Sequence, residues 1–357
     1  MKAALFYGGS DIRVAEVPMP EPGPGEVLVR VRAAGICGSD LHGYRGVAPW
    51  RAPTDREGRQ DGHELAGEVA AIGPGVTGLA VGQRVGIEPE HLIGCGTCIY
   101  CRRGDAQICP QRGQRHGQRH TSHGFAQYDV CLAHNVHPLP EHISTDAAAI
   151  LDCYACSVHA LHRVPILPYL TVVVLGTGAI GMTLGQVARA SGARRVIMVG
   201  TRDEPLAVAR RAGAADAWVA NSQVDPVAAV LDLTDGEGTD VVFETVGGNA
   251  PTLSQAVRMA RPGGTICILG IFTADPALDA QTAYRKELTI TWSNSYASWQ
   301  GRSEYAIALD LLATGRVAAE PIITHHYTLD QIEAAFAAAA DKKSSGAIKV
   351  LVHPNGP

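Results

Sequence analysis

Apolar and polar residues follow a regular order in the second half of the chain. From Tyr169 the sequence reads YLTVVVLGTGAIGMTLGQVARASGARRVIMVG: an apolar run, a glycine turn, a stretch with helical spacing and a second apolar run. This order predicts a strand, helix and strand. Further apolar runs, AWVA, TDVVFETVGG and GGTICILGIF, alternate with helical or polar stretches. We therefore expect a doubly wound parallel sheet here.

Strand patterns also occur on either side of this region. VLVRVRAAGICGSDLHGY begins as an alternating strand, Val27 to Val31, and runs into a glycine-punctuated turn. A second β-like run follows in GHELAGEVAAIG, and the segment PIITHHYTLDQIEAAFAAAADKKSSGAIKVLVHP has the pattern of strand, helix and strand. The chain thus has three successive regions.

Composition limits the classes of protein that fit this pattern. A chain of 357 residues, 46% hydrophobic and 18% charged, can bury a substantial core and is more easily divided into two domains than one. A net charge of −5 argues against nucleic acid and anionic membranes as partners. The N-terminus lacks the apolar core of a signal peptide, and no later span reaches the ~18 uncharged residues of a membrane helix. A cytoplasmic location is predicted.

Four of the nine cysteines lie close together in GCGTCIYCRRGDAQIC. Cytoplasmic thiols stay reduced, which argues against disulfides. Cys95, Cys98, Cys101 and Cys109 have the close spacing of a tetrahedral Cys₄ zinc site, typically a structural one. An iron–sulfur cluster uses similar spacing, but the surrounding Gly, Arg and Asp indicate a surface lobe, residues 94–110, and favour zinc.

A second group of possible metal ligands comes from separate segments. Cys37 lies in the turn CGSDLH, and His63 and Glu64 lie in GHELAGEV, where His63 follows Cys37 by 26 residues. One thiolate, one imidazole and one carboxylate form the mixed set that a catalytic zinc uses while keeping a position for water or substrate. Each residue alone has an ordinary structural interpretation, so the prediction rests on the set.

These three motifs occur in the order found in the zinc-dependent medium-chain dehydrogenases, the family of alcohol, polyol and threonine dehydrogenases, which the chain resembles along almost its whole length. The resemblance implies a Rossmann coenzyme domain inserted in a mainly β, GroES-like catalytic domain. The implied domains are 1–155, 156–292 and 293–357, with the last returning to the catalytic domain.

The resemblance also implies how the catalytic zinc is bound. Cys37 and His63 match its ligands, Glu64 would join or leave the ion as water and substrate exchange, and Asp152 in AAILDCYACSVHAL matches a further ligand. Cys153 is the lesser candidate, and a helix N-cap is the structural alternative for Asp152. Asp40 is expected to orient His63 through its other ring nitrogen, with Lys349 as a nearby basic partner.

A proton relay is implied in the same turn. Ser39 and His42 match the hydroxyl and imidazole that carry the alcohol proton outward in the family. Such a relay is needed because a metal lowers the pKa of a bound oxygen without removing the proton from the site. With an ordinary pKa near ~6.5, His42 can accept this proton at neutral pH. A surface histidine is the alternative.

A dinucleotide site is predicted at the first glycine turn of the doubly wound region. Gly176, Gly178 and Gly181 fit GxGxxG between a strand and a helix, where glycines let the backbone approach pyrophosphate. By resemblance, the backbone near Val246 and at Leu269–Ile271 would meet the nicotinamide. The full set of coenzyme contacts expected is Gly176, Gly178, Ile180, Gly181, Gly200, Thr201, Arg202, Val246, Leu269, Gly270 and Ile271.

The end of the second strand bears on the choice of coenzyme. Gly200 stands where an acidic residue would hold the ribose of NAD, and Thr201 and Arg202 follow it. A guanidinium binds phosphate well, so NADP is expected in preference to NAD. Asp203 is the alternative contact that would favour NAD.

The resulting prediction is a zinc enzyme that oxidises a secondary alcohol, polyol or sugar to the ketone and transfers hydride to NAD(P). Thr291 replaces the arginine that the polyol branch often has before Trp292, so the substrate stays open. The alternatives are a non-catalytic scaffold that binds NADP and zinc, and a zinc-free enone or quinone reductase.

Two further segments bear on assembly and on the surface of the protein. By resemblance, the strand-like run LTITWS is expected to pair copies of the chain into a homodimer or homotetramer. The segment QRGQRHGQRHTSHGFAQY, 111–128, is rich in histidine and arginine. It is expected to be a solvated surface loop, and a substrate-facing loop or accessory metal site is its alternative.

Overall fold

The computed structural model describes residues 1–47, 58–89, 92–115, 118–119 and 122–356. The chain divides into two compact units. Unit 1 consists of residues 1–152, 300–313 and 323–357, and unit 2 of residues 153–299 and 314–322. One boundary falls inside helix α4 (Leu151–Arg163), between Asp152 and Cys153.

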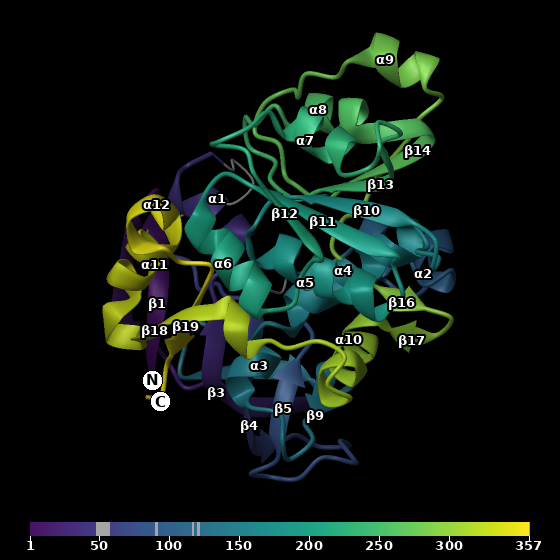
Figure 1. The fold of residues 1–357 in the computed structure, drawn as a ribbon. Helices are drawn as coiled ribbons and strands as arrows, with labels where there is room; N and C mark the ends of the chain where they lie inside the picture. Colours follow the sequence, from purple (N-terminus) through teal and green to yellow (C-terminus); the bar gives the residue numbers. More distant parts are fainter. Residues whose placement is uncertain (48–57, 90–91, 116–117, 120–121, 357) are drawn as a thin grey trace. The chain divides into compact units, whose positions relative to one another are not determined.

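Unit 1 is built on a mainly antiparallel sheet of seven strands (Figure 1). Its order is β18-β19-β3-β4-β5-β9, and β8 also pairs with β3. The strands are β3 (Glu26–Gly35), β4 (Glu64–Ile72), β5 (Arg84–Ile87), β8 (Tyr128–Leu132), β9 (Val136–Pro138), β18 (Ile323–Thr328) and β19 (Lys349–His353). Smaller strands are β1 (Lys2–Gly8), β2 (Asp11–Glu16), β6 (Gln114–Arg115), β7 (Gln118–Arg119) and β17 (Arg302–Ser303).

The helices of unit 1 are short, and one of them closes its core. They are α1 (Gly38–Tyr44), α2 (Ile99–Arg102), α3 (Thr145–Ala149), α10 (Glu304–Ala313), α11 (Ile332–Ala340) and α12 (Lys342–Ser345). Helix α11 buries residues at helical spacing, among them Phe336. The Phe336 ring centroid lies 5.3 Å from that of Phe6 and 5.5 Å from that of Phe125. This cluster joins α11 to the N-terminal strands.

Unit 2 contains a parallel sheet of six strands in the order β12-β11-β10-β13-β14-β15. The strands are β10 (Thr171–Leu175), β11 (Arg195–Gly200), β12 (Ala217–Ala220), β13 (Thr239–Glu244), β14 (Ala260–Ile268) and β15 (Thr289–Trp292), followed by the short β16 (Ser298–Trp299). The helices between them are α5 (Ala179–Ala190), α6 (Asp203–Arg211), α7 (Pro226–Asp232), α8 (Thr252–Met259) and α9 (Ala280–Arg285). This is the strand order of a dinucleotide-binding sheet.

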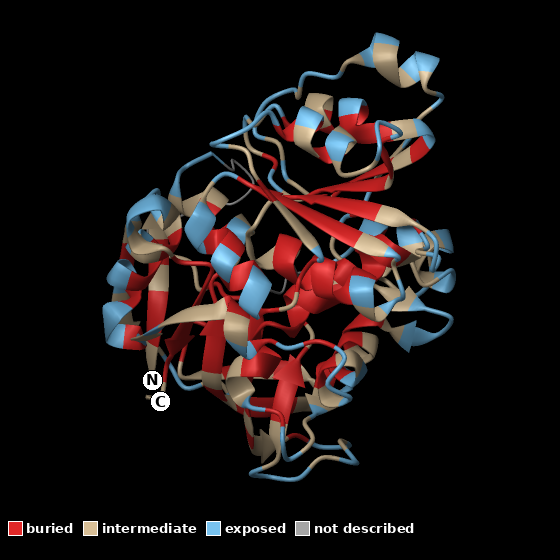
Figure 2. Ribbon diagram, in the orientation of Figure 1, coloured by how far each residue is buried: buried red, intermediate tan, exposed pale blue. Residues whose placement is uncertain are grey.

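Burial explains the apolar runs of this sheet. The central strands β10, β11 and β13 are buried over nearly their whole length (Figure 2). Parallel strands covered by helices on both faces lose the polar alternation of a half-exposed strand. The predicted doubly wound sheet is therefore confirmed, and so is the mainly β character of the other part of the chain. Among the described helices, none has the length and apolar character to span a bilayer.

Candidate functional site

Strand pairing brings the first candidate ligands together in unit 1. Strands β3 and β4 are antiparallel, with Gly35 at the end of β3 opposite Glu64 at the start of β4. Cys37 follows β3 as the N-cap of α1, and His63 directly precedes β4. One potential ligand atom from each of Cys37, His63 and Glu64 lies within 4.8 Å of the others. Residues distant in sequence thus form one compact donor set.

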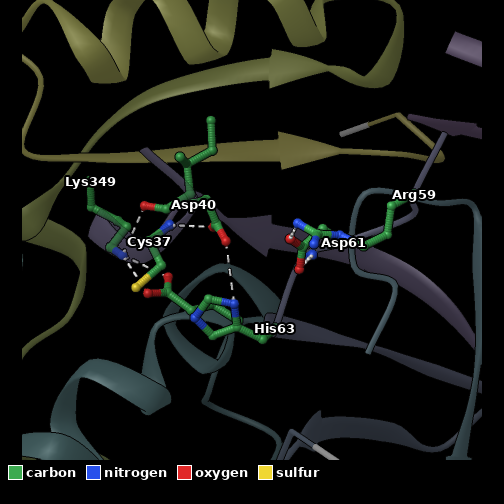
Figure 3. A network of polar contacts seen from close by, with 9 residues as sticks. Cys37, Asp40, Arg59, Asp61, His63 and Lys349 are labelled. Carbon is green, nitrogen blue, oxygen red and sulfur yellow. Dashed lines mark hydrogen bonds and ion pairs between the residues drawn. The ribbon is translucent and has the colours of Figure 1, made fainter. Parts of the chain in front are cut away.

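The Asp40 carboxylate lies beside the imidazole of His63, on the Nδ1 side of the ring (Figure 3). Asp40 Oδ1 lies 3.5 Å from His63 Nδ1, and Asp40 Oδ2 accepts a hydrogen bond of 2.8 Å from the backbone N–H of Cys37. A carboxylate on one ring nitrogen leaves the other, Nε2, for a metal and fixes the plane of the ring. Burial acts to lower the pKa of His63, but Asp40 and Cys37 outweigh it and raise this pKa well above its usual value.

Lys349 forms a buried ion pair with Glu64. Lys349 Nζ donates to Glu64 Oε1 at 2.8 Å and to Oε2 at 2.6 Å. Glu64 is 1% exposed and Lys349 3%. Burial acts to raise the pKa of Glu64, yet the charge of Lys349 lowers it, so the carboxylate is kept ionised. A side chain at Gly35 would not fit, because its Cβ would lie 2.1 Å from Glu64 Oε2.

Asp152 lies in the first turn of α4 and is 6% exposed. Its charge is one of those that raise the pKa of His63, so it acts electrostatically on the site. Because α4 begins at Leu151, Asp152 lies inside the helix rather than at its N-cap. Asp152 is not in the described set whose ligand atoms all lie within 4.8 Å of one another. Its direct ligation of zinc stays a prediction.

Ser39 and His42 both lie on the short helix α1 and are partly buried. They are three residues apart, so their side chains lie on the same side of the helix. Cys37, one of the candidate ligands, is the N-cap residue of this helix. The spacing suits a relay that starts beside the metal set, although the relay itself stays a prediction.

The four cysteines of the lobe also converge. Their sulfur atoms lie within 4.8 Å of one another, and Cys98 Sγ lies 3.5 Å from Cys101 Sγ and 3.7 Å from Cys109 Sγ. These distances are far beyond the ~2.05 Å of a disulfide. Thiolates bound to a tetrahedral zinc at ~2.3 Å lie ~3.8 Å apart. The spacing therefore fits a closed zinc site.

The surroundings of these sulfurs are also suited to a cation. The backbone N–H groups of Cys98 and Cys101 point at the sulfurs of Cys95 and Cys98, at 3.4 and 3.5 Å. Hydrogen bonds from Thr97 and from the backbone lower the pKa of Cys95 to about 6, whereas burial raises that of Cys101 to about 12. Four thiolates this close would repel one another, so a bound cation is needed for all four to ionise.

The three glycines of the turn in unit 2 differ in how closely other atoms approach them. Gly176 has φ +116°, which favours glycine, and a Cβ at Gly181 would lie 2.1 Å from the Gly176 carbonyl oxygen. A Cβ at Gly178, the N-cap of α5, would meet no atom within 4 Å. Gly176 and Gly181 are therefore required by packing, while Gly178 leaves open space at the start of a helix, where a phosphate binds well.

The end of β11 leaves little room for a side chain at Gly200. A Cβ at Gly200 would lie 2.4 Å from Thr177 Cγ2, so the Thr177 side chain fills this space. Thr201 is exposed and Arg202 is the N-cap residue of α6. Asp203 begins that helix and accepts a hydrogen bond of 3.0 Å from Gln223 Nε2. Thr177 was not among the predicted residues, and its contact with Gly200 is visible only in the fold.

Glu244 is a second residue that sequence reasoning missed. It ends β13, is fully buried, and its Oε1 accepts hydrogen bonds from Val246 N at 2.8 Å and Gly247 N at 2.9 Å. Its backbone oxygen accepts from Leu269 N at 2.8 Å. Glu244 thereby ties together the two loops predicted to meet the nicotinamide. The signal was an acidic residue directly after the apolar run VVF.

Two other expectations concern surface positions. Arg163 Nη2 donates a 2.9 Å hydrogen bond to Thr291 Oγ1, so α4 supplies a guanidinium beside the position where the polyol branch often has arginine. In the segment 111–128, His123 Nδ1 lies 3.2 Å from Asp129 Oδ1. His116 and His120 lie outside the described residues. That this segment is a solvated surface loop stays a prediction.

Comparison with known families supports the class that these sites indicate. Residues 23–141 match the alcohol dehydrogenase GroES-like domain, and residues 179–314 match the zinc-binding dehydrogenase model. Sorbitol dehydrogenase of Halalkalibacterium halodurans is 34% identical over 98% of this chain and 97% of its own length. L-Threonine 3-dehydrogenase of Pyrococcus horikoshii is 36% identical over 94% and 93%. The chain belongs to the zinc-dependent medium-chain dehydrogenase family.

Solved structures agree with this assignment. A zinc-binding dehydrogenase from Sinorhizobium meliloti bound to NADP has a TM-score of 0.86 at 30% identity, covering 99% of both chains. An alcohol dehydrogenase from Escherichia coli complexed with NADH has a TM-score of 0.85 at 28% identity, again over 99% of both. The predicted class, an oxidoreductase acting on alcohols or polyols, is confirmed.

Proposed function

We propose that the protein reversibly oxidises a secondary alcohol of a polyol, sugar or related compound to the ketone, with NADP as the preferred coenzyme. The observation that carries this proposal is the convergence of Cys37, His63 and Glu64, with Asp40 behind His63 and Lys349 behind Glu64. A purely structural zinc site has no use for an exchangeable carboxylate held by a buried lysine.

The reaction needs two groups that the chain would bind. When bound, zinc would stabilise the developing alkoxide as a Lewis acid, and the nicotinamide would accept the hydride. Cys37 and His63 would be permanent ligands, with Asp152 as a further one. Glu64 would be the exchangeable ligand, and Lys349 would keep its carboxylate charged whenever it leaves the ion.

The chain itself must remove the alcohol proton. Ser39 Oγ would accept the proton from the substrate hydroxyl as it donates its own toward His42, one turn further along α1. The His42 imidazole would then release the proton to water. Loss of His42 should therefore reduce kcat most at low pH, where fewer hydroxide ions replace the relay.

The relatives limit the substrate to a chemical class. Their names give sorbitol and L-threonine, and both molecules carry a secondary hydroxyl beside another polar group. We infer that the present substrate has the same local arrangement. Arg163, held against Thr291, is a candidate for recognising an additional polar substituent.

The coenzyme preference rests on the end of β11. The Thr177 side chain lies against Gly200, where a longer side chain would begin, and Arg202 is the N-cap residue of α6. We expect Arg202→Ala to lower kcat/KM for NADP by at least about tenfold, the effect of losing a hydrogen bond to a charged group. The kcat/KM for NAD should change little. A preference of the wild-type protein for NAD would reject this part of the proposal.

The direct test is an initial-rate screen of polyols, sugars and secondary alcohols with NAD and NADP in parallel. Zinc-loaded wild type should oxidise at least one of them, and His63→Ala should not. His142→Ala is the control, because His142 is exposed and bonds only to the backbone oxygen of Ala313 among the described contacts. No rate with any substrate would favour the non-catalytic scaffold, and absence of zinc would favour the zinc-free reductase.

We further propose that copies of the chain pair through β15 into a homodimer or homotetramer, and that the protein is cytoplasmic. The first proposal is supported by the position of β15 at the edge of the described six-stranded sheet. The second is supported by four closely spaced cysteines that need reducing conditions to bind zinc.

A further inference from the structure

Three polar side chains from distant segments converge in unit 1, away in sequence from both cysteine-containing sites. They are Asp146 of α3, His326 of β18 and His353 of β19. One potential ligand atom of each lies within 4.8 Å of the others. Because β18 and β19 are paired in parallel, the two histidines are held by the same stretch of sheet.

The hydrogen bonds of His353 determine which of its nitrogen atoms is available. His353 Nδ1 lies 3.0 Å from the backbone oxygen of Arg32. A carbonyl oxygen can only accept, so Nδ1 carries the hydrogen and Nε2 keeps its lone pair. Only 9% of the His353 side chain is exposed. A buried imidazole whose Nδ1–H is fixed by a backbone oxygen has the orientation of a metal ligand.

His326 faces this lone pair, and Asp146 lies beside both rings, with Asp146 Oδ1 3.8 Å from His353 Nδ1. His326 Nδ1 lies 3.0 Å from His353 Nε2 and 3.6 Å from Asp146 Oδ2. The side chain of His326 is 51% exposed, so one side of the cluster is open to solvent. Two imidazole nitrogens and a carboxylate oxygen, with positions left for water, form a donor set typical of zinc and other divalent transition metals.

The frame around this cluster is fixed. Ser144 caps α3 by accepting a 3.0 Å hydrogen bond from Ala147 N. Beyond His353, Asn355 Nδ2 donates to the backbone oxygens of Val31 at 2.9 Å and Gln127 at 2.8 Å. The ligand set is thus largely preorganised, and binding an ion would order little besides the exposed ring of His326.

We propose that Asp146, His326 and His353 bind a divalent transition-metal ion, with zinc as the representative ion. The ion would link α3 to the two C-terminal strands of unit 1. This site is independent of the proposed dehydrogenase chemistry, since it shares no residue with that site or with the lobe. The opposing possibility is a direct hydrogen bond from His326 Nδ1 to His353 Nε2, with no ion between them.

The test is the number of zinc ions bound per chain in equilibrium dialysis of the full-length protein at a fixed free zinc concentration. His326→Ala should bind one ion fewer than wild type, and Asp146→Asn should bind zinc at this site more weakly. The matched control is His325→Ala, the neighbouring residue on the same strand, whose Nδ1 bonds to Thr324 Oγ1 instead.

The proposal is tested by the difference in bound zinc between variants. This difference can be measured even if the catalytic site or the lobe fails to bind zinc. His326 is exposed, and its replacement should leave the folded state intact by circular dichroism. Equal zinc binding by His326→Ala, His325→Ala and wild type would overturn the proposal, because the cluster would then be a hydrogen-bonded histidine pair.

Discussion

At the scale of single residues, the candidate site consists of its ligands and of the residues that hold those ligands in place. Asp40 faces the far nitrogen of His63, Lys349 pairs with Glu64, and Gly35 leaves the space that Glu64 fills. The sequence predicted the partner role of Asp40. It gave no reason to select Gly35, because the collision involves a strand 29 positions away and becomes visible only when β3 and β4 are paired.

The steric role of Gly35 leads to a matched pair of substitutions. Gly35→Ala places Cβ against Glu64 Oε2 at 2.1 Å, whereas Cβ at Gly38 meets no atom within 4 Å. We expect Gly35→Ala to lower the free energy of unfolding by about 1–3 kcal/mol, the usual cost of overpacking, and to weaken zinc binding at the Cys37 site. Gly38→Ala should do neither in urea titration and zinc analysis; equal effects of the two changes would contradict this role.

Removal of Lys349 should be more damaging. Lys349→Met leaves a buried carboxylate without its cation, which typically costs about 3–5 kcal/mol. The pKa of Glu64 is lower in the folded protein than its ordinary value of 4.5. The ion pair therefore stabilises the folded protein fully above pH 4.5, and this stabilisation is lost as the pH falls through the folded-state pKa of Glu64.

The difference in unfolding free energy between wild type and Lys349→Met should therefore be largest near neutral pH and shrink below about pH 4.5. Urea titrations of metal-stripped protein at several pH values measure it. A difference that is the same at every pH would show that the lysine stabilises only through packing.

At the scale of elements, the sequence predicted most of the molecule. The long apolar runs of unit 2 became β10, β11, β13 and β14, because strands buried on both faces must be apolar throughout. Two contacts in the turns could not be predicted from the sequence: the Thr177 side chain lies against Gly200, and Glu244 joins two loops. Both contacts cross between strands, so neither follows from local pattern.

The glycine turn before α5 allows coenzyme binding to be separated from packing. Gly178→Val enters open space with a backbone, φ −82° and ψ −178°, that any residue can adopt. We expect this change to leave the melting temperature nearly unchanged and to weaken NADP binding at least about tenfold, by blocking the approach of the pyrophosphate.

Gly181→Ala is the contrasting change in the same turn. Its Cβ would press on the Gly176 oxygen at 2.1 Å, so it should lower the melting temperature as well as coenzyme affinity. Thermal unfolding and fluorescence titration with NADPH distinguish the two variants. Unchanged affinity in a folded Gly178→Val protein would exclude the turn as the pyrophosphate site.

At the scale of the whole molecule, the order of motifs along the chain is enough to identify the family. The substrate and the number of subunits could not be derived in this way, because both depend on exposed side chains that the fold does not constrain. Trp292 at the end of β15 is 59% exposed, on the edge proposed to pair with a second copy.

Trp292→Lys tests this assembly. A lysine on an edge strand disfavours pairing with another strand, so the variant should show a lower molar mass than wild type at the same concentration in light scattering. Tyr284→Lys, which changes an exposed residue of α9, is the control. A wild-type monomer, or an assembly unaffected by the change at Trp292, would contradict the proposed edge.

The central claim is that Cys37 and His63 bind a catalytic zinc with Glu64 as a third, exchangeable ligand. An anomalous difference map of zinc-loaded crystals, recorded at the zinc absorption edge, tests it most directly. We predict a peak ~2.3 Å from Cys37 Sγ and ~2.0 Å from His63 Nε2, separate from a second peak among the four lobe cysteines. A zinc-loaded, active protein with no peak between Cys37 and His63 would contradict the account.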